Sequence, residues 1–204
     1  MLQPGVLEPG TLAHLKTIMT RKEFSQFVLV GGTALAIQIG HRLSVDLDFF
    51  SDQKFDSDEI LYQVSQLGKA NEVFRNSIMI RLELDGIKID FVHYPYPFIE
   101  KCVFFDEVKM ASKQDICAMK LAAVTGRGLK KDFYDIFFLL KDFSFKQMIF
   151  FYEKKYTNRN YFQMMKSILW FDDADNSEQP VMLEKCPSWD EIKIKIESVV
   201  KEAS

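Results

Sequence analysis

The sequence predicts an α+β protein, with a mixed sheet in its first half and a helical bundle in its second half. Up to about residue 92, short apolar runs alternate with turns rich in glycine and aspartate, which is typical of strands and short helices. From Ser112 onward, apolar residues recur at helical spacing. Pro95 and Pro97 interrupt the pattern between the two halves. The predicted organisation is therefore a core of residues 1–98 followed by a mostly helical subdomain of residues 99–204.

In the first half, glycines and turn residues set the expected boundaries. Gly31 and Gly32 break the first buried strand, Thr33 can cap the helix that follows, and Gly40 can end it. Asp85-Gly86 indicates a tight hairpin. The expected helices cover residues 11–22, 34–39 and 57–67, and the expected strands cover 27–30, 45–50, 73–75, 78–84, 87–92 and 105–110.

In the second half, only helices and one polar loop are expected. The loop covers residues 172–179, which are almost entirely acidic or polar. The expected helices cover residues 113–125, 131–141, 144–155, 159–169 and 188–202.

Composition excludes several classes of protein. Of the 204 residues, 48% are hydrophobic and 27% are charged, which is the balance of a globular chain. The net charge of -3 provides no global basic field for nucleic acid. The three cysteines lack a CxxC pairing, which argues against a zinc site or a disulfide framework. Without a signal-peptide pattern or an apolar run of about 18 residues, we expect a cytoplasmic protein that does not enter a membrane.

The carboxylates Asp46 and Asp48 form the sharpest chemical signal. On a strand, alternate side chains share a face, so these two acids are predicted to lie together. Two negative charges at such a short distance favour the binding of a cation that neutralises them. Carboxylate oxygens favour Mg²⁺, which often binds phosphate oxygens of a substrate at the same time. The bland alternative is a pair of solvated acids at a strand end.

Three further features extend this signal. Asp90 lies between the apolar residues of a nearby strand and can act as a third carboxylate, either binding a second metal ion or deprotonating an attacking hydroxyl. The Gly31-Gly32 turn offers backbone N–H groups to phosphate at a helix start. Arg42 is placed to touch a phosphate, and Ser44 is placed to line the same pocket as Asp46. Each interpretation has a purely structural alternative.

The helical half contains a second polar cluster. Lys120, Arg127 and Lys131 can hold triphosphate oxygens, as phosphoryl transfer requires. Asp132 can orient one of these cations or cap the helix that begins near it. Asp135 is expected only to partner a neighbouring base. The roles of Lys130 and Lys131 are not distinguished by sequence.

Together these segments resemble the AbiEii/AbiGii toxin family of the polymerase-β-like nucleotidyltransferase superfamily. The resemblance covers about residues 10–145 and rests on Gly31-Gly-Thr-Ala-Leu-Ala, Gly40-His-Arg-Leu-Ser-Val-Asp-Leu-Asp-Phe-Phe and Lys120-Leu-Ala-Ala…Arg127…Lys131-Asp-Phe-Tyr-Asp. It implies a mixed-sheet nucleotidyltransferase core, with the helical subdomain completing the cleft. It also implies Mg²⁺-dependent transfer of a nucleoside monophosphate (NMP) from a nucleoside triphosphate (NTP) to RNA, tRNA foremost, or to protein. A cognate antitoxin would restrain such an effector.

By the same resemblance, each site residue has an implied role. Gly31, Gly32 and Thr33 would touch the triphosphate, with Ser44 beside it. Asp46 and Asp48 would bind metal, and Asp90 would complete the acid set. Lys120 would contact the nucleotide, and Asp132 matches a later functional position of the family.

Two other functions fit the same residues. One is nucleotide transfer to a small molecule, such as an aminoglycoside-like hydroxyl compound, because an acidic protein suits a cationic substrate. The other is a catalytically inactive binding module that uses its Phe-rich helices as an interface.

Overall fold

The computed structural model describes residues 3–157 and 160–203, and its chain divides into two compact units. The first unit consists of Met1–Gly40 and Ser44–Ser112, and the second of His41–Leu43 and Lys113–Ser204. The boundary predicted between residues 98 and 99 lies inside the first unit, because the chain after it still adds strands to the first sheet.

A seven-stranded mixed sheet, in the order β3-β4-β5-β2-β1-β7-β6, forms the first unit. Strand β2 runs parallel to β5 and β1 parallel to β7, and the other neighbours are antiparallel. The predicted mixed sheet is therefore confirmed. The strands are β1 (Val28–Leu29), β2 (Leu47–Ser51), β3 (Ala70–Arg75), β4 (Met79–Leu84), β5 (Ile87–His93), β6 (Val103–Phe105) and β7 (Val108–Met110).

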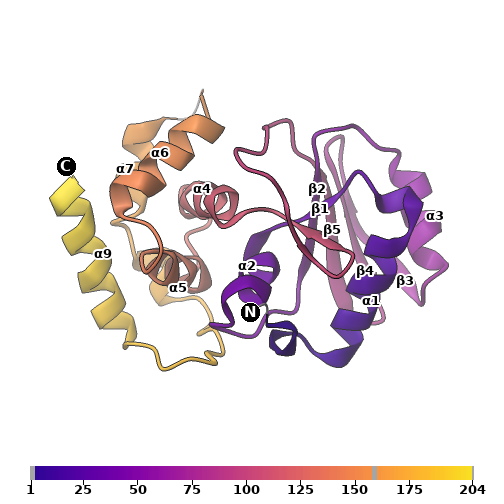
Figure 1. Ribbon diagram of the computed structural model, residues 1–204, viewed down its shortest axis with the longest axis horizontal. Coiled ribbons are helices and arrows are strands. Elements are labelled where there is room, and N and C mark those ends of the chain that lie inside the picture. Colours follow the sequence, from indigo (N-terminus) through magenta and orange to yellow (C-terminus); the bar gives the residue numbers. More distant parts are fainter. Residues whose placement is uncertain (1–2, 158–159, 204) are drawn as a thin grey trace. The chain divides into compact units, whose positions relative to one another are not determined.

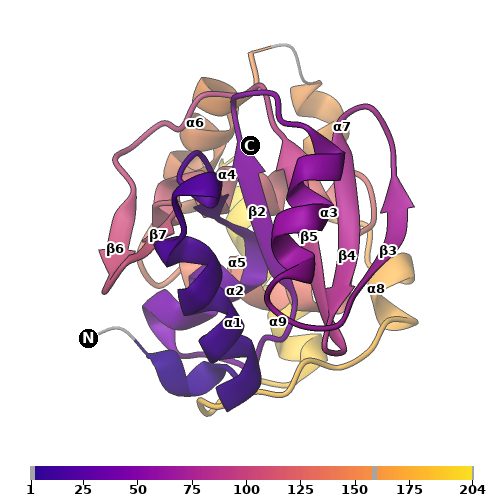
Figure 2. The same cartoon turned by 90° about the vertical axis from the view of Figure 1, so that its right-hand side faces the viewer.

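Helices cover both faces of this sheet. Figures 1 and 2 show α1 (Pro9–Thr20) and α3 (Ser57–Ser65) on one face and α2 (Gly31–Ile39) on the other. Short 3₁₀ turns cover Pro4–Val6 and Lys22–Phe24. Aromatic rings fill much of the core: the ring of Phe91 lies 5.5 Å from that of Phe24, 4.9 Å from that of Phe27 and 5.2 Å from that of Phe49. This packing accounts for part of the chain's high phenylalanine content.

Three predicted boundaries in the first unit need correction. Helix α2 begins at Gly31 with Val30 as its N-cap, so Thr33 lies inside the helix and does not cap it. Strand β2 begins at Leu47, so Asp46 precedes the strand. The single strand predicted over residues 105–110 is the hairpin of β6 and β7, whose turn places Asp106 at a φ of 48°.

The second unit is helical, as predicted. Helix α4 packs against α5, α6 and α7, and α9 packs against α5 and α6. A buried ion pair of 2.8 Å joins Lys155 of α6 to Asp115 of α4. The bounds are α4 Lys113–Val124, α5 Lys130–Leu139, α6 Phe145–Lys155, α7 Tyr161–Ser167, α8 Asp172–Asp175 and α9 Trp189–Ala203. The short α8 lies where a polar loop was expected, and residue 159, the predicted start of one helix, is outside the described residues.

Within the described ranges, the helices are too short or too polar to span a bilayer.

Candidate active site

A row of charged side chains crosses the middle of the first unit's sheet. Asp48 on β2 is in register with Asp90 on β5, and Asp90 is in register with Arg81 on β4. Residues opposite one another in adjacent strands point to the same face. The residues on either side of these two acids point to the other face and are buried: Leu47 and Phe49 on β2, and Ile89 and Phe91 on β5. The structure therefore brings the predicted acids Asp48 and Asp90 together.

Asp46 is held beside this row by the start of α2. The Thr33 hydroxyl donates a hydrogen bond to the main-chain carbonyl of Asp46 and is 2.8 Å from the Ser44 hydroxyl. Thr33 and Ser44 are both buried. Thus these two predicted site residues lie next to Asp46. The hydrogen bond from Thr33 fixes the backbone at Asp46, and Ser44 contacts Thr33. On the other side, Lys88 Nζ lies 3.9 Å from Asp46 Oδ2.

The first turn of α2 approaches the Asp48 carboxylate very closely. Gly31 has a φ of 69°, and a Cβ atom on it would lie 2.5 Å from Asp48 Oδ2. Only glycine combines this backbone conformation with this space. The N–H groups at a helix start favour an anion. The Gly31-Gly32 turn and the carboxylates thus belong to one site.

Arg81 is a site residue that the sequence interpretation missed. Its Nε and Nη2 atoms each donate a 2.7 Å hydrogen bond to Asp90, one to each carboxylate oxygen. The hydrogen bonding to Asp90 raises the pKa of Arg81. Burial opposes this effect, and the negative charges of Asp90, Asp48 and Asp46 add to it. A signal was present in the sequence: Arg81 and Asp90 are equally distant from the Asp85-Gly86 turn, so a two-residue hairpin pairs them.

The acids Asp46, Asp48 and Asp90 could provide some of the ligands of a magnesium ion, but not a complete set. In residues 3–157 and 160–203, no group of three or more His, Cys, Asp or Glu side chains is arranged to hold a metal ion. Both oxygens of Asp90 accept hydrogen bonds from Arg81. We therefore keep Asp46 and Asp48, the pair indicated by the sequence, as the candidate ligands. Mg²⁺ commonly binds through one or two carboxylates and completes its shell with water and substrate phosphates. The donor chemistry therefore suits a cation that arrives with a nucleotide.

A buried ionic network in the second unit surrounds Asp135. Arg42 donates to both of its carboxylate oxygens, from Nε at 2.7 Å and from Nη2 at 2.9 Å. His41 Nε2 lies 2.7 Å from Asp135 Oδ1, and Lys120 Nζ lies 2.5 Å from Oδ2. All four side chains are buried. Asp135 is thus the centre of this network, a larger role than the local pairing predicted for it.

Asp132 extends the network toward the surface. Lys120 Nζ lies 2.8 Å from Asp132 Oδ1, and Arg127 Nε lies 3.2 Å from Asp132 Oδ2. The Arg127 side chain is 54% exposed, whereas that of Asp132 is fully buried. Helix α5 begins at Lys130 with Leu129 as its N-cap, so Asp132 orients cations and does not cap the helix. The structure therefore brings the predicted residues Lys120, Arg127 and Asp132 together.

Charge pairing decides the ionisation of this network. Burial alone would raise the pKa of Asp135, but Lys120 and Arg42 outweigh it and hold that pKa well below its usual value. Burial likewise opposes the charge on Lys120, and the paired Asp132 and Asp135 outweigh it and raise the pKa of the lysine. For His41, burial prevails and lowers the pKa, so the neutral ring donates from Nε2. Its Nδ1 has no hydrogen-bond partner among the described residues.

Two residues predicted to contact phosphate are used inside the protein. The Arg42 side chain is buried, and its guanidinium donates hydrogen bonds to Asp135 and to the main-chain carbonyl of Leu43. The Lys120 ammonium is equally buried between two aspartates. Lys131 lies in the first turn of α5 and is partly exposed. Both buried cations therefore position neighbouring groups in this structure.

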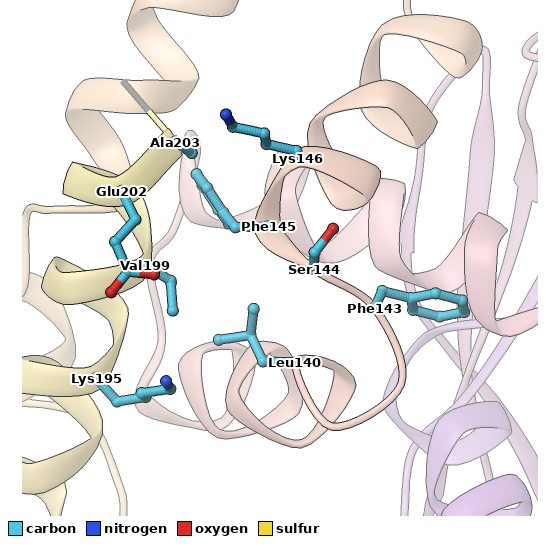
Figure 3. Close-up of a pocket in the computed structure, with 9 residues that line it drawn as sticks. All are labelled: Leu140, Phe143, Ser144, Phe145, Lys146, Lys195, Val199, Glu202 and Ala203. Carbon is cyan, nitrogen blue, oxygen red and sulfur yellow. The ribbon is translucent and has the colours of Figure 1, made fainter.

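A separate cavity of about 220 Å³ lies elsewhere in the second unit. Figure 3 shows it between the end of α5, the start of α6 and the last turns of α9. Leu140, Phe143 and Val199 contribute apolar walls, and Lys146 and Lys195 contribute cationic groups. The predicted site residues do not line it, so it is distinct from the ionic network.

Substitution of Gly31 by alanine is expected to abolish the nucleotide transfer that the sequence resemblance implies. The added Cβ would lie 2.5 Å from Asp48 Oδ2 and would force that carboxylate to move, and the positive φ would be strained by about 1 kcal/mol or more. A rate assay together with thermal unfolding would separate loss of activity from loss of fold. Gly10→Ala is the matched control, because a Cβ added at that position in α1 would meet no heavy atom within 4 Å apart from its chain neighbours and the nearby backbone of its own helix. This variant should keep wild-type activity. Full activity of folded Gly31→Ala would contradict the close approach.

Comparison with known proteins finds a matching family model and a close sequence relative. Residues 15–180 match the family model for "Nucleotidyl transferase AbiEii toxin, Type IV TA system". An uncharacterised protein from Aquifex aeolicus is 35% identical over 184 residues, which cover 87% of this chain and 88% of the relative.

Solved structures share the fold. A candidate nucleotidyltransferase from Helicobacter pylori aligns with a TM-score of 0.57 and 16% identity, over 96% of this chain and 95% of that one. MenT4, a nucleotidyltransferase toxin from Mycobacterium tuberculosis, aligns with a TM-score of 0.53 and 13% identity, over 96% and 86% of the two chains.

Proposed function

The chain belongs to the AbiEii family of nucleotidyl transferase toxins and is a nucleotidyltransferase, and on that premise we propose that it moves an NMP from an NTP to an acceptor RNA or protein. Among RNAs, tRNA is the first acceptor to test. The proposed cellular role is that of a type IV toxin–antitoxin or abortive-infection effector in the cytoplasm, restrained by a cognate antitoxin.

The observation that carries this proposal is the contact between Gly31 and Asp48. A helix start without a side chain is suited to triphosphate oxygens, and it lies directly against a carboxylate suited to a metal ion. A site that holds both ligands is what nucleotide transfer requires. When bound by Asp46 and Asp48, Mg²⁺ would neutralise phosphate charge during the transfer.

In the proposed reaction, a hydroxyl oxygen of the acceptor forms a bond to the α-phosphorus of the NTP. The bond from that phosphorus to the oxygen bridging the β-phosphorus breaks, and pyrophosphate leaves. The backbone N–H groups of Gly31 and Gly32 would orient the triphosphate. Asp90 would either complete the metal ligands or accept the proton of the attacking hydroxyl.

The test is an incubation of the pure full-length chain with Mg²⁺, total tRNA and each α-labelled NTP in turn. We expect label in RNA or in protein with one or more of the four nucleotides, and none after chelation of Mg²⁺. A parallel preparation of the Asp46→Ala variant controls for contaminating transferases and should incorporate no label.

Three outcomes count against the proposal. Equal labelling by Asp46→Ala and by wild type would show that the transfer does not depend on the carboxylate of Asp46. Label found only on added aminoglycosides would identify the small-molecule reaction instead. Isothermal titration that detects no NTP binding at millimolar Mg²⁺ would identify a binding module without this activity.

A further inference from the structure

Arg81 neutralises a carboxylate that the proposed chemistry needs. The Arg81–Asp90 pair has two parallel hydrogen bonds of 2.7 Å, the bidentate geometry that makes arginine–carboxylate pairs strong. The Asp90 side chain is 9% exposed and that of Arg81 is 35% exposed. The guanidinium therefore covers Asp90, while the Arg81 side chain remains partly accessible to solvent.

The position of Arg81 also ties it to the other two acids. Asp48, Asp90 and Arg81 form one cross-strand row, so their side chains share a face of the sheet. Asp48 and Asp46 both add to the electrostatic stabilisation of the charged guanidinium. Arg81 is thus a cation bonded to Asp90 in the same cross-strand row as Asp48.

We propose that Arg81 is a counter-ion that competes with divalent metal for the acids Asp46, Asp48 and Asp90 until a nucleotide arrives. This inference rests on the proposed function, since it takes Asp46 and Asp48 as metal ligands. While both Asp90 oxygens accept from Arg81, they are poor ligands, and the positive charge repels a divalent cation. An NTP brings negative charge that attracts the metal ion and provides another partner for the guanidinium. Metal binding is thereby made dependent on the nucleotide.

Two other roles for Arg81 predict different behaviour. A purely structural cross-strand pair would affect stability and leave metal affinity unchanged. A dedicated phosphate ligand would support nucleotide binding and have no effect on metal alone. The experiment therefore measures metal affinity without nucleotide and nucleotide affinity separately.

The experiment is a titration of full-length protein with Mn²⁺ alone, in which electron paramagnetic resonance measures the free ion. We expect Arg81→Met to bind Mn²⁺ about tenfold more tightly than wild type, because removal of one adjacent positive charge relieves repulsion of a divalent ion. Arg81→Lys, which keeps the charge and loses the two-bond geometry, should gain about threefold.

Arg75→Met is the matched control. Arg75 lies on β3, in register with buried Ile80, and is bonded to Asp58 of α3, so it is on the opposite face of the sheet. Its replacement changes the net charge by the same amount. We expect its Mn²⁺ affinity to stay within about twofold of wild type, since Arg75 is partly exposed on the far face and its charge is screened there.

The outcomes separate this inference from the proposed function. Wild-type affinity for Mn²⁺ in folded Arg81→Met would overturn the counter-ion role, and if it came with a loss of affinity for a non-hydrolysable NTP of tenfold or more, Arg81 would be a dedicated phosphate ligand instead. If Arg81→Met fails to fold, Arg81→Lys takes its place, and an unchanged affinity in that variant overturns the role equally. Absence of Mn²⁺ binding by wild type even with the non-hydrolysable NTP would instead refute Asp46 and Asp48 as metal ligands.

Discussion

Replacement of Asp48 by asparagine is expected to slow nucleotide transfer by about 10³-fold, which corresponds to about 4 kcal/mol of transition-state stabilisation. The Asp48 carboxylate faces the first turn of α2 and shares a row with Asp90. In the proposed function, it therefore lies where triphosphate charge would be neutralised. Asparagine keeps the shape and removes the charge. The side chain is only partly buried, so the fold should be retained.

The measurement is the initial rate of NMP incorporation at saturating NTP, with thermal unfolding to confirm the fold. Asp52→Asn is the matched control, because this exposed acid lies just beyond the end of β2 and loses the same charge. It should retain the wild-type rate to within about twofold, since surface charges are largely screened. A rate for folded Asp48→Asn within tenfold of wild type would show that transfer does not depend on this carboxylate.

The first half of the candidate site could be predicted because its parts are close in sequence. Gly31, Asp46 and Asp48 fall within one strand–turn–helix–strand segment, and strand alternation placed Asp48 on a polar face. The exact start of β2 could not be predicted, because Thr33 holds the Asp46 carbonyl outside the strand. Arg81 needed an inference about register, which the Asp85-Gly86 turn would have supported.

The fold was predictable where local signals were strong. The mixed sheet and the helical second half followed from apolar periodicity and turn residues. The β6–β7 hairpin was missed because its turn contains Asp106 and Glu107 and no glycine, although Asp106 adopts the positive φ that glycine usually supplies. Its place beside β1 depends on pairing with residues far away in the chain, which periodicity does not reveal.

The buried network could not be derived from sequence spacing. Asp135 lies 93 residues from Arg42 and 94 from His41, and no local pattern predicts a pairing at that distance. From its spacing of three residues after Asp132, Asp135 would be expected to lie on the polar surface of a helix. Folding places it at zero exposure among three basic side chains.

For this reason Asp135→Asn is expected to cost about 3–5 kcal/mol of unfolding free energy, the usual cost of breaking a buried ion pair by removing one partner. Arg42 and Lys120 would remain buried with less negative charge to compensate them. Urea unfolding followed by tryptophan fluorescence measures this directly, because Trp170 and Trp189, the chain's two tryptophans, both belong to the second unit. Asp142→Asn is the matched control: it removes an exposed ion pair of 2.6 Å with Lys113 and should cost about 1 kcal/mol or less.

The pH dependence gives this prediction a sign that a packing defect would not reproduce. The pKa of Asp135 is depressed in the folded chain, so its ion pairs stabilise fully above the unfolded value of about 3.9 and are lost as the pH falls through the folded value. The difference in unfolding free energy between wild type and Asp135→Asn should therefore be constant from about pH 7 to pH 5 and shrink below about pH 4. A difference that stays constant into acid would mean that asparagine disturbs packing, and that the charge on Asp135 contributes little to the stability of the second unit.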